Sequence, residues 1–272
     1  MIVIELNLIE EVHTLKNQDW DKAIQLNPND AHAYHGRGRN YINEAESDLQ
    51  YQLAINDFDK AIQLDPNFIE AYADRSDAYS ELGQFQQTIE NLDKVIQLTL
   101  DTGEFSLGEF SLDEIYYIRG LAYYELEENQ RAIQDFDMAI QLHTDDTFGE
   151  KETYFFSRGG AYISMGEDQR GIEDYDKAIQ LDPNYARVYH VRGGAYFDLD
   201  QYRQAIENLD KAIQLYSDTG TDEYTAYAYN LRGNAYFQLG ETQQAEQDRV
   251  KSLELDPYYS RPYRLYRPTK AN

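Results

Sequence analysis

The chain has 272 residues, no cysteine, and 50 acidic against 24 basic side chains, which gives a formal net charge of −26 at pH 7. Without cysteine there are no disulfides and no thiol chemistry. A field this acidic repels phosphate backbones and anionic lipid, so nucleic acid and membrane surfaces are poor partners. The N-terminus lacks the basic start of a secretory signal, and no apolar run is long enough for membrane insertion. We therefore expect a cytoplasmic protein.

Residues 1–30 are a degenerate N-terminal half-repeat of a unit whose complete form recurs further along the chain. Their second half carries Trp20, Ala23 and Ile24 at helical spacing, just before Asn27-Pro28. The residue before a proline is pushed out of the α region, so a helix should end there. We expect this segment to act as a cap that covers the first complete unit.

The complete unit is clearest in residues 186–215. Tyr189, Gly193 and Tyr196 share one face of a first helix at helical spacing, and an apolar stripe that includes Leu209 marks a second helix. A segment of about thirty residues buries too little apolar surface to fold alone. The unit therefore needs neighbours, and the chain supplies them.

Copies of the unit are marked by an arginine, a small residue, and a tyrosine shortly afterwards. In the clearest pair, 34 residues separate Arg158 from Arg192. The second helix of most copies carries alanines at fixed spacing, and several copies close on Leu-Asp-Pro-Asn. The marker pairs are Arg37-Gly38, Arg75-Ser76, Arg119-Gly120, Arg158-Gly159, Arg192-Gly193 and Arg232-Gly233.

These residues and this period resemble the tetratricopeptide (TPR) repeat. The resemblance implies an all-α fold, a right-handed α-solenoid of antiparallel helix pairs whose first helices line a concave groove. The chain departs from the family pattern in its arginine, where leucine is usual, and in Gly171, where alanine is usual. The six TPR-like repeats that we expect are residues 31–68, 69–102, 113–146, 152–185, 186–219 and 226–259.

Three insertions lie between repeats, at residues 103–112, 147–151 and 220–225. The first insertion contains the pentapeptide Gly-Glu-Phe-Ser-Leu twice in succession. Without these ten residues the neighbouring repeats would be 34 residues apart. We expect helix extensions with a mobile tip in all three, and ordinary tolerated loops more than functional ones.

The last repeat and the residues after it differ in charge from the rest. Glu246, Arg249 and Ser252 replace residues that are apolar in other repeats, as is typical of a terminal repeat that ends the stack in water. Residues 260–272 form a basic C-terminal tail with three arginines, one lysine and no acid. We expect this tail either to lie against the acidic body or to be disordered.

The sequence carries no convincing signature of an enzyme, a metal site or a cofactor site. Asp101-Thr102-Gly103 and Asp218-Thr219-Gly220 resemble aspartic-protease triplets, but both lie between predicted helices. His32 and His35 are close in sequence, yet no further ligand completes a metal set, so we expect solvent-facing histidines. We therefore predict a non-catalytic protein without a cofactor.

The six marker arginines have two interpretations. Each precedes the small residue where two helices approach, and the second helices carry aspartates such as Asp135, Asp137, Asp174 and Asp210. We favour a repeated structural pair between guanidinium and carboxylate. The alternative is an arginine ladder in the groove that binds acidic ligands.

The predicted function is a scaffold that binds a peptide or protein segment in the groove of repeats three to six. The ligand would carry apolar anchors and basic flanks that meet an acidic rim. The alternative is a homo-oligomeric assembly element that self-associates through the same surface. The predicted groove residues are Tyr117, Leu121, Tyr124, Phe156, Gly160, Ile163, His190, Gly194, Phe197, Asn230, Asn234 and Phe237.

Overall fold

The computed structural model describes residues 19–103, 106–107, 110–144, 151–220 and 222–256. Helices account for nearly all of them, which confirms the predicted all-α class. The helices divide between two compact units, the first ending at Glu128 and the second beginning at Asn129. The half-repeat prediction for residues 1–18 and the tail prediction for residues 260–272 lie outside the described residues.

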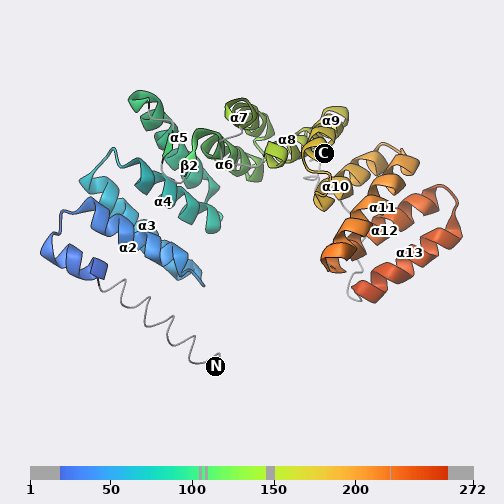
Figure 1. Ribbon diagram of the computed structural model, residues 1–272, viewed down its shortest axis with the longest axis horizontal. Coiled ribbons are helices and arrows are strands. Elements are labelled where there is room, and N and C mark those ends of the chain that lie inside the picture. The colour runs from blue at the N-terminus through green and yellow to red at the C-terminus, as the bar shows by residue number, and fades with distance from the viewer. Residues whose placement is uncertain (1–18, 104–105, 108–109, 145–150, 221, 257–272) are drawn as a thin grey trace, which may run out of the picture. The chain divides into compact units, whose positions relative to one another are not determined.

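The first unit opens with a helical stretch at residues 19–26. Consecutive helices then pack on one another along the chain (Figure 1). A pair of two-residue strands, β1 (Ser106–Leu107) and β2 (Phe110–Ser111), separates the last two helices. The helices are α2 (Ala31–Asn43), α3 (Asp48–Leu64), α4 (Ile69–Glu81), α5 (Phe85–Thr102) and α6 (Leu112–Glu125).

The second unit repeats the arrangement, with α8 against α9, α10 against α11 and α12 against α13 (Figure 1). Each pair also packs on the next, so that α12 lies on α11. The helices are α7 (Asn129–Leu142), α8 (Lys151–Ser164), α9 (Asp168–Leu181), α10 (Ala186–Asp198), α11 (Tyr202–Thr219), α12 (Asp222–Gln238) and α13 (Thr242–Leu255).

The helix ends follow from local chemistry. Asp30 caps α2, because its carboxylate accepts hydrogen bonds from the backbone N–H groups of His32 and Ala33. The long helices α5 and α11 both end at a glycine in the left-handed conformation, Gly103 and Gly220. Glycine adopts that conformation without the strain that a Cβ would cause.

The insertion at residues 103–112 corrects one expectation. We expected helix extensions with a tip, but an antiparallel strand pair follows the end of α5, with Ser106 opposite Ser111 and Leu107 opposite Phe110. The duplicated Phe-Ser-Leu supplies two short runs with strand propensity, which explains the pairing. At residues 220–225 the expected extension is present, because α11 runs to Thr219 and α12 begins at Asp222. The insertion at 147–151 lies outside the described residues up to Lys151, where α8 begins.

The helices α8 and α9 approach each other closely at two glycines. A Cβ added to Gly159 would lie 2.7 Å from the ring of Tyr175, and one added to Gly171 would lie 2.8 Å from the carbonyl oxygen of Gly159. Alanine at position 171, the usual family residue, therefore does not fit this repeat. The departure from the family pattern has a local cause.

Candidate functional site

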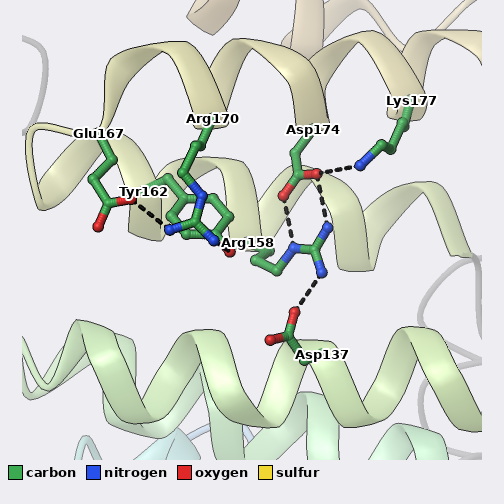
Figure 2. A network of polar contacts seen from close by, with 7 residues as sticks. All are labelled: Asp137, Arg158, Tyr162, Glu167, Arg170, Asp174 and Lys177. Atoms are coloured by element: carbon green, nitrogen blue, oxygen red, sulfur yellow. Dashed lines mark hydrogen bonds and ion pairs between the residues drawn. The ribbon is translucent and has the colours of Figure 1, made fainter.

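The marker arginine of α8 lies within a network of carboxylates. Arg158 Nε and Nη2 donate hydrogen bonds to the two carboxylate oxygens of Asp174 on α9, at 2.7 and 2.8 Å. Its Nη1 donates to Asp137 on α7, and Lys177 Nζ lies 3.1 Å from Asp174 (Figure 2). Burial alone would lower the pKa of Arg158, but the hydrogen bonds to Asp174 and Asp137 raise it above its ordinary value.

The same contact recurs along both units. Each arginine that follows this pattern joins the second helix of its own repeat to the second helix of the repeat before. The own-repeat partners are Asp57 of Arg37, Asn91 of Arg75, Asp174 of Arg158, Asn208 of Arg192 and Asp248 of Arg232. The preceding partners, in the order of the arginines, are Asp21, Asp59, Asp93 (of Arg119), Asp137, Asp176 and Asp210.

These contacts decide between the two interpretations of the arginines. Their side chains are only 14% to 22% exposed. Each guanidinium also lies over an aromatic ring three residues earlier, at 5.1 to 5.8 Å from the centroid. The structural-pair prediction is confirmed, and the alternative of an arginine ladder that binds acidic ligands is wrong.

The sequence indicated that aspartates of the second helices pair with the arginines, but not that one partner comes from the preceding repeat. The own-repeat partner lies 16 residues after the arginine in four of these five contacts, and a fixed separation of this kind can be found from the sequence. The preceding aspartate lies 16 to 26 residues before the arginine, because the insertions fall between them. This aspartate can be recognised only by its place in its own helix, because it lies two residues after the residue that pairs with the arginine of that repeat.

The histidines are more buried than expected. His35 Nε2 lies 2.7 Å from Asp74 Oδ2, and its ring packs on Phe68 at 4.7 Å between centroids. His190 is 9% exposed. The expectation of solvent-facing histidines is wrong for both, because helix packing encloses them. Among the described residues, no three His, Cys, Asp or Glu side chains form a group that could hold a metal ion.

The predicted groove residues of α8 and α10 are partly buried. Phe156, Gly160 and Phe197 are half-buried, whereas Ile163, His190 and Gly194 are buried. Burial, followed by the nearby Arg187 cation, lowers the pKa of His190 to about 4, so this ring is neutral at pH 7. The three buried residues belong to the packing between helices and present little surface to a ligand.

The residues of α8 and α10 that remain accessible form a mixed aromatic surface. Phe156 packs on Tyr185 at 5.4 Å between ring centroids, and the guanidinium of the exposed Arg187 lies 5.1 Å from the Phe156 centroid. Phe197 packs edge-on against Tyr202 of its own repeat, at 5.4 Å. These rings therefore both support the fold and contribute surface.

The most exposed groove residues are on α12. Phe237 is 65% exposed, Asn234 is exposed, and Asn230 is half-buried. All three line a hollow of about 430 Å³ between α12 and α13. The other lining residues are Gly233, Thr242, Ala245, Glu246 and Arg249. The sequence predicted that these α12 residues line a groove, but it did not predict that residues of α13 line the same hollow.

The groove residues of α6 belong to the other compact unit. Tyr117, Leu121 and Tyr124 are all half-buried there. Asp77 of α4, in the same unit, has an unusually high pKa. Burial, followed by the charges of Asp74 and Glu81, raises the pKa of this carboxyl to about 7.

Comparison with known proteins gives the family. Profiles of the tetratricopeptide repeat match residues 58–90, 113–145 and 184–257, and a further TPR repeat profile matches residues 159–200. The chain belongs to the TPR family. No curated protein sequence matches this TPR chain. None of its described helices combines the length and the apolarity that crossing a bilayer requires.

Solved TPR structures share the fold. MamA is 28% identical with a TM-score of 0.55, and the match covers 63% of this chain and 92% of that one. YrrB, described as a TPR protein with an unusual peptide-binding site, is 21% identical with a TM-score of 0.57, covering 73% and 93%. The C-terminal part of a TPR repeat-containing protein from Cytophaga hutchinsonii is 17% identical with a TM-score of 0.70, covering 94% and 95%.

Proposed function

We propose that this TPR protein is a non-catalytic scaffold that binds a segment of another protein along α8, α10 and α12. The observation that supports this most directly is Phe237, a large aromatic side chain that is 65% exposed beside the amides of Asn230 and Asn234. An exposed ring beside polar groups that can fix backbone orientation is typical of a peptide-binding surface. The likeness to YrrB, a TPR protein with a peptide-binding site, supports the same proposal.

The chemistry of the ligand follows from the surface around these residues. Phe156, Phe197 and Phe237 favour apolar or aromatic anchors, and the exposed Asp198 adds an acidic group to the rim. The net charge of −26 attracts cations over distance. The ligand is therefore a protein segment with apolar anchors and basic flanks.

The test is capture of a partner by the immobilised chain from the lysate of its source, compared with a Phe237→Ala variant. Phe237 is exposed, so its removal should leave the melting temperature unchanged while reducing capture. Leu181→Ala is the matched control, because Leu181 is 49% exposed but lies on α9. Equal capture by the Phe237→Ala variant would contradict the proposal. Phe197 is less suitable, because its contact with Tyr202 contributes to the fold.

Self-association through the same exposed surface is the competing function. Light scattering over a range of protein concentrations separates the two. A mass that stays at one chain opposes self-association, whereas a mass that doubles with concentration and reverts in the Phe237→Ala variant favours it.

A further inference from the structure

The hollow between α12 and α13 corresponds to a seam, the line of contact along α10 and α11 one repeat earlier, where the next helix, α12, packs. There, Ile206 and Leu209 of α11 are buried in a cluster that includes Leu231 and Ala235 of α12. Aligning Arg232 with Arg192 places Glu246 and Arg249 at the positions of Ile206 and Leu209. The last repeat therefore offers the same backbone setting, but none of the described helices packs into it, and Phe237 at its edge is exposed.

The side chains of this seam do not fit another repeat of the same kind. Glu246 and Arg249 pair with each other at 2.7 Å, with their side chains 58% and 59% exposed. Position 250 is valine, whereas the corresponding residue in the second helices before it is the aspartate that accepts the next arginine, such as Asp210. A second copy of the chain stacked end to end would find no acceptor there, and two chains of charge −26 repel each other.

A segment with suitable chemistry begins two residues after α13. Residues 257–272, the C-terminal segment, contain four tyrosines and a leucine that could cover an exposed ring. They also contain three arginines and one lysine but no acid, so the remainder of the chain carries −30, from −26 − 4. Its rings match the exposed Phe237 at the hollow, and its cations are attracted by the negative charge of the rest of the chain.

The length of the segment allows it to reach the hollow. The 14 residues of α13 span about 21 Å at 1.5 Å per residue. An extended chain from Asp256 to Thr269 reaches about 40 Å, at roughly 3.3 Å per residue. A short tether also gives an effective local concentration on the order of millimolar, so weak contacts are enough.

We propose that the C-terminal segment of this chain docks into the hollow between α12 and α13, with its rings against Phe237 and its cations facing the acidic residues around the seam. The docked segment covers the end of the second unit. It also covers Asn234 and Phe237, so it would compete with any ligand that uses the α12 end of the binding surface.

The absence of cysteine from the chain permits a direct test in the full-length protein. One cysteine replaces Thr269 in the C-terminal segment, and a second replaces Thr242, which lines the hollow. The matched control places the second cysteine at Gln247, an exposed neutral residue of α13 outside the hollow lining. Gln247 is nearer than Thr242 to the start of the segment, so a segment that is merely tethered would reach it at least as often.

Mild oxidation at low protein concentration should cross-link the Thr242→Cys pair about tenfold faster than the Gln247→Cys pair. Replacing Arg261, Arg264, Arg267 and Lys270 by glutamine in the Thr242→Cys pair should remove this preference, as should high salt. Circular dichroism confirms that each variant is folded. Equal rates for the two pairs, no cross-link, or only disulfide-linked dimers would overturn the proposal, the last identifying a second copy as the occupant. The readout needs no ligand, so it stands whether or not the scaffold function is correct.

Discussion

The guanidinium of Arg158 donates two parallel hydrogen bonds to the carboxylate of Asp174, at 2.7 and 2.8 Å, across the contact between α8 and α9. Asp174 is almost completely buried, with 3% of its side chain exposed. Planar two-point pairing of this kind fixes both distance and orientation. Because Arg158 also donates to Asp137 on α7, one side chain sets the positions of three helices within the second unit.

Arg158→Ala should destabilise the second unit strongly, because it leaves Asp174 buried with only Lys177 beside it. Removing one partner of a buried pair costs about 3–5 kcal/mol. Arg158→Lys should recover only part of this, because an ammonium cannot make the two-point contact. Urea denaturation measures both. Asp137→Asn is the comparison variant: Asp137 is 51% exposed, so its loss should cost about 1 kcal/mol or less. A loss for Asp137→Asn as large as that for Arg158→Ala would contradict this account.

Gly171→Ala should destabilise the protein although alanine favours helices by about 1 kcal/mol over glycine. The new Cβ would lie 2.8 Å from the carbonyl oxygen of Gly159 and 2.7 Å from the Ile163 side chain, so α8 and α9 must separate. Overpacking of this kind costs about 1–3 kcal/mol. Thermal denaturation measures the change. Adding Ile163→Val removes the contact with Cδ1 but leaves those with Cγ1 and with the carbonyl oxygen of Gly159. A full rescue by that second substitution would therefore show that the backbone contact is unimportant.

Asp77 should make the stability of the first unit depend on pH. Its pKa is raised to about 7 in the folded chain, from an ordinary 3.8, so the folded state holds a proton that the unfolded state has lost. The free energy of unfolding should therefore fall as the pH rises from about 4 to about 7. Asp77→Asn removes this loss, so the variant should exceed the native protein by about 1–3 kcal/mol at pH 8 and match it more closely at pH 4.

Denaturant titrations at a series of pH values check this prediction. Glu81→Gln serves as a second variant, because the charge of Glu81 contributes to the raised pKa of Asp77. Because it lowers the folded-state pKa of Asp77, it should make the loss of stability smaller and complete it at a lower pH. An Asp77→Asn variant whose advantage is the same at pH 4 and pH 8 would show that this carboxyl titrates in its ordinary range.

The repeating helices could be predicted from sequence because their signals are local. The spacing of Tyr189, Gly193 and Tyr196 follows from the geometry of one helix, and the pairing of Arg158 with Asp174 follows from a fixed separation within one repeat. The binding surface was harder, because exposure depends on what the neighbouring helix covers. Phe197 and Phe237 occupy the same position on α10 and α12, yet Phe197 is half-buried and Phe237 is 65% exposed. The strand pair after α5 was missed because two-residue strands give too short a pattern to read.

Val250 makes the last helix of the second unit different from the second helices before it, because it replaces the aspartate that would accept an arginine of a following repeat. Every earlier second helix that follows the arginine contact also accepts a hydrogen bond from the arginine of the repeat after it. Within the described residues, α13 takes part in the arginine contact only through Arg232 of its own repeat. Its amide hydrogens should therefore exchange with solvent sooner than those of α9 or α11, and unfolding of the second unit should begin by fraying of α13 and proceed backward one hairpin at a time.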